Sequence, residues 1–261
     1  MDIAVFQKKK QRMTLFMVIL IGLTLLSARM TDFDFLHSVQ TLPKALSWMA
    51  SNLVVTEQAL TKMPSILDKL IETIFLSITA TTTASVLALL LALMGSHTTK
   101  INSFFGSLSR IIASVYRNIP IVAWALILLL SFGQSALTGY FALFLATFGF
   151  LTRAFIETID ETSSSSVEAL RATGATYFQV VAKAVIPECS PQIISWVLFM
   201  IETNIRSSTL VGILTGTGIG FAFDLYYKSM NYHVVCLITI SIVVVVIGIE
   251  LLSNYVRRVI L

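Results

Sequence analysis

Charge is scarce in this sequence. Only 12% of its 261 residues are charged, while 56% are hydrophobic and the mean hydropathy is +0.85. A soluble globular domain carries about 25% charged residues, so this chain has too little polar surface to cover a globule in water. The scarcity excludes a soluble enzyme and indicates an integral membrane protein.

Motifs that carry catalysis or bind cofactors are also missing. The two cysteines, Cys189 and Cys236, are too few for a disulfide scaffold. The three histidines, His37, His97 and His233, lack metal-ligand spacing. No G-x-x-x-x-G-K-[ST] occurs, so the chain has no phosphate-binding loop with which to hydrolyse ATP. We expect no catalytic residue, no metal site and no cofactor on this chain.

Long apolar runs are what the sequence has instead. A run of about 20 apolar residues spans a bilayer as a helix, because lipid forces every backbone polar group to pair internally. The pattern therefore predicts an all-α polytopic membrane protein with about six transmembrane helices in a single domain, residues 1–261. The spans are predicted at 13–29, 71–94, 111–132, 137–156, 193–214 and 234–252.

Basic residues indicate how these spans are oriented. Four basic side chains lie within residues 8–12, before the first span, and Arg257 and Arg258 follow the last one. Lys and Arg are enriched in cytoplasmic segments, and this topology puts most of the 18 on that side. We therefore expect both termini in the cytoplasm. The net charge of +4 then reflects membrane orientation, and we expect no nucleic-acid partner.

Small residues recur along the second predicted span. Every fourth position carries Thr73, Ser77, Thr81 and Ser85, and a neighbouring stripe carries Ala80, Ala84, Ala88 and Ala92. Such spacing lets helices approach closely in lipid. Helix packing is the favoured interpretation, and a role in transport is the alternative.

A polar stretch separates the fourth and fifth spans. Ser165 and Glu168 match a capping box, S-x-x-E, which predicts that a short helix begins there. Gly174 predicts a bend, and Pro187 is expected to end a second helix. From these residues alone, an ordinary linker at the membrane surface is as good an interpretation as a functional loop.

The string Glu168-Ala-Leu-Arg-Ala-Thr-Gly174-Ala175, continuing to Ile186-Pro187, resembles the EAA loop of ABC-importer permeases. The family pattern is E-A-A, three residues, G, about nine residues, then I-x-L-P. This chain departs from it with Leu170 at the third position and Ile-Pro directly at the end. The resemblance covers roughly residues 70–258 and implies the type I, MetI-like permease fold. It also implies that residues 163–187 dock an ATP-hydrolysing subunit. The implied contact residues are Glu168, Ala169, Gly174, Ala175 and Pro187.

Two charged residues interrupt the fifth predicted span. Each charge at a helix centre costs about 2.5–3.5 kcal/mol on insertion scales. Glu202 and Arg206 have the i, i+4 spacing, with Glu first, that favours pairing within one helix. One interpretation is a structural ion pair, and the other is a lining of the translocation path. The candidate path residues are Ser195, Glu202, Asn204, Arg206, Ser207, Ser208 and Thr209.

Glycines follow this charged stretch at alternate positions. Gly216, Gly218 and Gly220 lack the spacing and the preceding strand of a dinucleotide-binding motif. Because each glycine weakens a helix by about 1 kcal/mol relative to alanine, we expect a bent or re-entrant hinge at the outer end of the path.

Within ABC permeases, residues 202–220 and Arg171-Ala-Thr-Gly-Ala175 resemble the phosphonate-transporter permease, whereas Arg117-Asn-Ile-Pro120 is similar to methionine-type permeases. The resemblance implies a non-enzymatic transport subunit in the bacterial cytoplasmic membrane that moves phosphonate or a related phosphorus oxyanion. The implied partners are ABC ATPase subunits that hold ATP and Mg, an outer substrate-binding protein, a second copy of this chain and membrane lipid. The alternatives are a permease for another solute, such as an amino acid, and a channel or scaffold without an ATPase.

Overall fold

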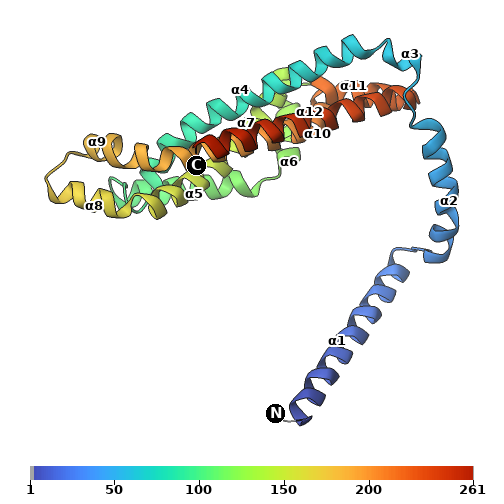
Figure 1. Cartoon of the computed structure of the whole chain (residues 1–261), viewed down its shortest axis with the longest axis horizontal. Helices are drawn as coiled ribbons and strands as arrows, with labels where there is room; N and C mark the ends of the chain where they lie inside the picture. The colour runs from blue at the N-terminus through green and yellow to red at the C-terminus, as the bar shows by residue number, and fades with distance from the viewer. Residues whose placement is uncertain (1–2, 261) are drawn as a thin grey trace. The chain divides into compact units, whose positions relative to one another are not determined.

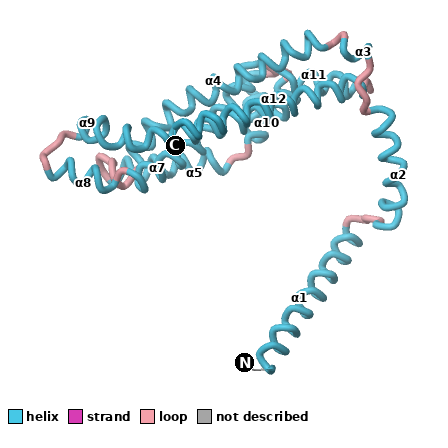
Figure 2. Tube along the Cα trace, viewed as in Figure 1, coloured by secondary structure: helices cyan, strands magenta, loops and turns pink. Residues whose placement is uncertain are grey.

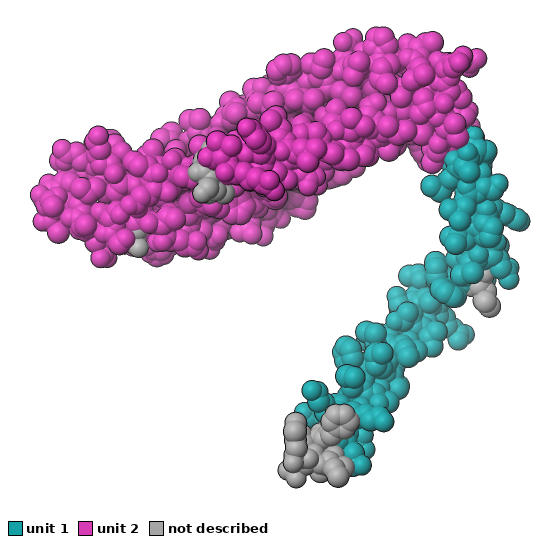
Figure 3. All heavy atoms as spheres, viewed as in Figure 1, with its two compact units in different colours: residues 1–52 teal, residues 53–261 magenta. Residues whose placement is uncertain are grey.

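The computed structural model describes residues 3–260, and every regular element in that range is a helix (Figure 2). Contacts divide the chain into two compact units, residues 1–52 and 53–261 (Figure 3). The first unit consists of α1 (Ile3–Met30) and α2 (Phe35–Asn52). The apolar side chains of α1 between residues 13 and 26 are exposed, which suits a helix whose solvent is lipid.

The second unit contains long helices that run beside one another (Figure 1). Helix α7 packs against α4, α5, α6 and α10, and α10 also contacts α4, α11 and α12. The elements of this unit are α3 (Glu57–Leu60), α4 (Met63–Gly95), α5 (Ser103–Asn118), α6 (Ile121–Phe132), α7 (Ala136–Thr162), α8 (Ser164–Ala172), α9 (Tyr177–Val180), a π-helical turn η1 (Val181–Val185), α10 (Ile186–Thr215), α11 (Gly218–Lys228) and α12 (Tyr232–Ile260).

By length and hydropathy, five helices of the described chain qualify as membrane spans, and a bent pair would make a sixth. The five are Gln7–Met30, Met63–Gly95, Ala136–Thr162, Tyr177–Thr215 and Tyr232–Val259. The sequence predicts one span at 111–132, and the structure divides that segment between α5 and α6, which meet at 89°. The break lies at Ile119, which is extended because the residue before a proline is driven out of the α conformation.

Small residues hold α4 close to its neighbours. The four alanines of the stripe are completely buried, and Thr73, Ser77 and Thr81 beside them are buried as well, with at most 2% of each exposed. Each buried hydroxyl is satisfied locally, as when Thr81 donates to the carbonyl oxygen of Ser77 at 2.7 Å. The interpretation of this stripe as a packing surface is confirmed.

The expected end of a helix at Pro187 is wrong. The chain is helical without interruption from Tyr177 to Thr215, and Pro187 lies in the first turn of α10. The π-helical turn η1 ends at Val185, two residues before Pro187, and the Ile186 N–H donates to the Val181 carbonyl oxygen. A widened turn accommodates a residue that has no N–H to donate, so the proline is tolerated within a continuous helix.

Candidate functional site

The segment between α7 and α10 is anchored by apolar side chains. Val167 on α8, Val180 on α9 and Val185 on η1 are almost completely buried in one cluster with α4, α7 and α10. Leu170 and Ala175 pack against the same cluster. These contacts hold α8 and α9 at one end of the second unit, away from α3 and α11 (Figure 1).

The predicted coupling residues lie on the outside of this segment. Glu168, Ala169, Gly174 and Pro187 are exposed, and Ala175 is half-buried. Phe178, at the start of α9, is 82% exposed and adds an aromatic side chain to this outward-facing surface. The sequence motif does not include this phenylalanine, although an aromatic residue in a polar loop could have signalled it.

Gly174 makes the bend that its position predicted. Its φ is +81°, a left-handed conformation that L side chains adopt at a cost of about 1–2 kcal/mol. Three N–H groups, of Thr173, Gly174 and Ala175, donate to the last carbonyl groups of α8 and close its end. A Cβ at residue 174 would meet nothing within 4 Å, so the space beside the bend is open.

The predicted capping box is wrong. Ser165 lies inside α8, whose N-cap is Ser163. The reciprocal interaction belongs instead to the next helix, where the Thr176 N–H donates to Gln179 Oε1 at 2.8 Å. Sequence spacing could not decide between them, because Ser163, Ser164, Ser165 and Ser166 offer four equivalent hydroxyl groups in succession.

On α10 the predicted ion pair is present and has a third member. Arg206 Nη2 donates to Glu202 Oε1 at 2.7 Å, so the i, i+4 pairing is confirmed. Arg257 of α12 brings its Nη2 within 3.9 Å of the other carboxylate oxygen. The Glu202 side chain is only 10% exposed, whereas that of Arg206 is 52% exposed. The sequence predicts only that Arg257 follows the last span, and no local pattern indicates that it reaches this carboxylate.

The remaining polar residues of α10 divide between the interior and the surface of the bundle. Asn204 is buried and donates to Thr81 of α4 at 2.8 Å and to Thr147 of α7 at 2.7 Å, so its amide joins three helices. Ser208 is also buried and donates to the carbonyl oxygen of Ile205. The half-buried residues of the predicted path are Ser195, Ser207 and Thr209.

The glycines after α10 form a tight reversal of the chain. Gly216 and Gly218 have φ values of +71° and +59°. Gly220 has a different role, because a Cβ there would lie 2.0 Å from the Thr209 carbonyl oxygen. Because Gly220 has no side chain, α11 packs directly on the backbone of α10. The predicted hinge is therefore two turn residues and one residue of close helix contact.

Helix α4 supports this reversal from outside. The Gly218 N–H donates to Glu72 Oε1 at 3.2 Å, and the Ile219 N–H donates to Thr73 Oγ1 at 2.9 Å. These bonds satisfy two of the free N–H groups at the start of α11, where a negative charge also complements the helix dipole. Glu72 and Thr73 thereby fix the first turn of α11 to α4.

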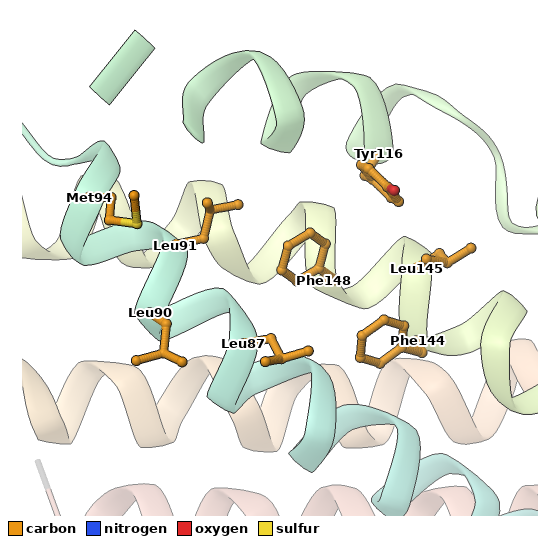
Figure 4. A pocket seen from close by; sticks show the side chains of 8 residues that line it. All are labelled: Leu87, Leu90, Leu91, Met94, Tyr116, Phe144, Leu145 and Phe148. Atoms are coloured by element: carbon orange, nitrogen blue, oxygen red, sulfur yellow. The ribbon is translucent and has the colours of Figure 1, made fainter. Parts of the chain in front are cut away.

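Two further observations concern the binding of small ligands and metal ions. A cavity of about 340 Å³ lies between α4, α5 and α7 (Figure 4). Its lining is apolar except for Tyr116, so it offers an anion almost nothing. Among the described residues, no group of three or more His, Cys, Asp or Glu side chains could hold a metal ion.

Residues 84–260 match the model of a family described as "Binding-protein-dependent transport system inner membrane component". The chain belongs to this family. The matched region contains the coupling segment, the charged residues of α10 and α12, and the glycine reversal. The chain is therefore a multi-pass inner-membrane component of an ABC import system, as its resemblance to the EAA-loop permeases implied.

Individual permeases agree with the family assignment. The chain is 31% identical over 189 residues to the phosphite transport system permease protein PtxC of Stutzerimonas stutzeri, covering 72% of this chain and 69% of that protein. It is 29% identical over 191 residues to the phosphate-import permease protein PhnE of Mycolicibacterium smegmatis, covering 73% of this chain. The matched part is only 36% of that relative's length.

A solved structure shows the fold of this permease. An inward-facing chain of the MetNI methionine ABC transporter superposes with a TM-score of 0.69 at 19% identity. The superposition covers 79% of this chain and all of that one. The predicted all-α, MetI-like permease fold is confirmed.

Proposed function

We propose that this permease is the membrane-spanning subunit of an ATP-driven importer for a phosphorus oxyanion, such as phosphite, phosphate or a phosphonate. The names of the relatives described above support this substrate class, since one is a phosphite permease and the other a phosphate-import permease. The named relatives are permease proteins of transport systems. In the proposed role this chain likewise carries no catalytic residue, and a separate subunit hydrolyses ATP.

The charge balance at Glu202 is the observation that carries the proposal. A carboxylate that neutralised one arginine would leave nothing to attract an anion. Here a single carboxylate lies against two guanidinium groups, those of Arg206 and Arg257. The cluster keeps a surplus positive charge, and Arg206 exposes half of its side chain. A guanidinium fork matches the oxygens of a phosphorus oxyanion, which carries the opposite charge.

The exposed face of α8 and α9 supports the docking of an ATPase. Glu168, Ala169, Gly174 and Phe178 face away from the apolar cluster that anchors the segment. In the proposed assembly, two copies of the chain form the path and each docks one ATPase, which binds ATP and Mg. A substrate-binding protein delivers the anion at the outer face, and both termini lie in the cytoplasm.

Uptake into proteoliposomes tests the proposal. The permease is reconstituted with its ATPase and binding protein, and ATP-driven uptake of phosphite, phosphate, a phosphonate and methionine is measured. Wild-type uptake of a phosphorus oxyanion is expected. Uptake of methionine alone would keep the importer and discard the substrate class, and flux that is indifferent to ATP would refute the importer.

Gly174→Asp separates docking from folding in the same assay. The Asp side chain would enter open space, and Asp is among the residues that best tolerate a positive φ, so the fold is expected to survive. We expect the variant to lose co-purification of the ATPase and to lose uptake. Met230→Asp is the matched control, since Met230 already holds a φ of +56°, is 75% exposed and lies in the turn between α11 and α12. Equal ATPase binding by the two variants would contradict a docking role for residue 174.

A further inference from the structure

Asp160, near the end of α7, gathers three hydrogen bonds on one carboxylate oxygen. Its Oδ1 accepts from Ser96 Oγ at 2.5 Å, from the Thr98 N–H at 3.1 Å and from Thr98 Oγ1 at 3.2 Å. The two residues that supply these three donors, Ser96 and Thr98, belong to the short connection between α4 and α5. Hydrogen bonds to a charged acceptor are stronger than those between neutral groups, so this carboxylate holds the connection firmly to α7.

The connection is equally fixed to α4. The Ser96 N–H donates to the Ala92 carbonyl, and Thr99 Oγ1 donates to the Leu93 carbonyl at 2.7 Å. Ser96 and Thr99 are almost completely buried. Gly95 lets α4 approach α7, because a Cβ there would lie 2.6 Å from the Ile156 side chain. The connection therefore cannot shift without moving the ends of α4 and α7.

Helix α8 reaches this connection through one side chain. Arg171 Nη2 donates to the Thr98 carbonyl oxygen at 2.9 Å. On its other side α8 is tied to α10, where Ser166 donates to the Glu188 carboxylate. The faces of Glu168 and Ala169 are exposed, so a protein that docks there can displace the helix. Thr98 is thus bound to Arg171 by its carbonyl group and to Asp160 by its N–H and hydroxyl groups.

We propose that Arg171, Thr98 and Asp160 form a mechanical link that transmits displacement of α8 to the ends of α4 and α7. Arg171 and Asp160 are positioning residues of the transport cycle, which touch neither the ATP nor the transported anion. This inference rests on the proposed function, because it assigns the motion to the docked ATPase. It adds a route from α8 to α4, which α8 does not adjoin along the chain: α8 follows α7 directly after Ser163 and leads to α10 through the Gly174 bend, α9 and η1.

Contacts that only stabilise the fold would behave differently from contacts that transmit motion. Loss of a stabilising contact lowers the amount of folded transporter, so uptake and ATP hydrolysis fall together. Loss of a transmitting contact leaves ATP hydrolysis intact, while the helices that line the path no longer move with α8 and uptake falls. The distinguishing quantity is therefore the number of anions taken up for each ATP hydrolysed.

The experiment measures this ratio in proteoliposomes that contain the full permease, its ATPase and its binding protein. Arg171→Met keeps the aliphatic stem and removes every donor. We expect the ratio to fall about five-fold or more, the lower range of measured coupling between sites. Asp160→Ala should do the same, whereas Asp160→Asn keeps Oδ1 as an acceptor and should stay within about two-fold of wild type. Arg153→Met, which breaks an exposed pair with Glu157 on α7, is the control and should leave the ratio unchanged.

A second readout does not depend on the transported anion. Amide hydrogen exchange at residues 96–99 of the assembled transporter should respond to ATP in wild type and not in Arg171→Met. A wild-type ratio and a wild-type exchange response in Arg171→Met would overturn the link. Failure of wild-type uptake beside an intact exchange response would discard the substrate class and keep the link. Absence of any ATP response in wild type would overturn both.

Discussion

Glu202 shows how one side chain can decide the character of a helix. Its carboxylate is nearly enclosed, yet it binds Arg206 of its own helix and lies beside Arg257 of α12. The Nε and Nη2 atoms of Arg257 are shielded from solvent and have no hydrogen-bond partner among the described residues. An arginine held in this way depends on the nearby negative charge, so the carboxylate serves both guanidinium groups at once.

Removing that charge should therefore be costly. We expect Glu202→Gln to lower the free energy of unfolding by about 3 kcal/mol, because the shielded guanidinium group of Arg257 loses its counter-charge. Thermal unfolding in detergent measures the loss. Glu157→Gln breaks another i, i+4 pair with arginine, but there both side chains are well exposed, so it should cost less than about 1 kcal/mol.

A double variant checks the cause of this loss. Arg257→Gln added to Glu202→Gln removes one of the stranded charges and should recover part of the stability. If Glu202→Gln and Glu157→Gln were equally stable, the enclosed cluster would have no energetic importance. Sequence spacing predicted the pair with Arg206, because both residues lie on one helix. It could not predict Arg257, whose approach depends on how α12 packs against α10.

At the scale of elements, closeness of approach decides the arrangement. The small residues of α4 allow it to pack along α7, and Asn204 then joins α10 to both through two hydroxyl groups. Helix α11 comes nearer still to α10, because Gly212 and Gly220 bring backbone against backbone. A Cβ on Gly212 would lie 2.4 Å from the Thr217 carbonyl oxygen, so neither helix has room to accept a side chain.

Gly220→Ala tests this contact. Its Cβ would lie 2.0 Å from the Thr209 carbonyl oxygen, and the backbone cannot yield as a flexible side chain would. We expect a loss of about 1–3 kcal/mol in the free energy of unfolding, the usual cost of overpacking. Gly248→Ala in α12 is the control, since nothing lies within 4 Å of the added methyl group. Thermal unfolding should show this control unchanged or stabilised by up to about 1 kcal/mol. Equal losses in both variants would mean that the contact is not selective for glycine.

At the scale of the whole molecule, residues 53–261 form the permease core and residues 1–52 form a separate amino-terminal unit. Residues 53–261 contain the coupling segment, the charged cluster and the glycine reversal. The family model begins at residue 84, and the MetNI chain is covered completely by 79% of this one. Residues 1–52 contribute no residue to any of these features. The core should therefore fold without them.

Deletion of residues 1–52 tests that independence. We expect the remaining chain to insert into membranes and to unfold within a few degrees of the full-length protein. Because α1 is itself long and apolar enough to span, we also expect the deletion to reverse which side of the membrane the amino terminus occupies. Membrane fractionation measures insertion, and thermal unfolding in detergent measures the stability of the shortened chain. Aggregation of the shortened chain outside the membrane would show that the first unit is required for folding.

The sequence by itself determined the class of the protein and most of its helices. Long apolar runs and scarce charge leave only a bundle of membrane helices, since lipid satisfies no backbone polar group. Local patterns also sufficed for the pairing of Glu202 with Arg206 and for the bend at Gly174, because each depends on residues within a few positions of one another. Patterns of this kind failed where neighbours in space decided the outcome.

Only the tertiary structure decided the rest. It set the 89° angle between α5 and α6 at a break that Pro120 already favours, and it carried the helix through Pro187 by means of a π-helical turn. It also brought Arg257 to Glu202, and Arg171 and Asp160 to opposite sides of Thr98. These contacts join residues that are far apart in the chain, and the apolar and small side chains that permit them are common to many possible packings. The physical reason is that a membrane sequence specifies strongly what each helix is, and only weakly which neighbour each helix will meet.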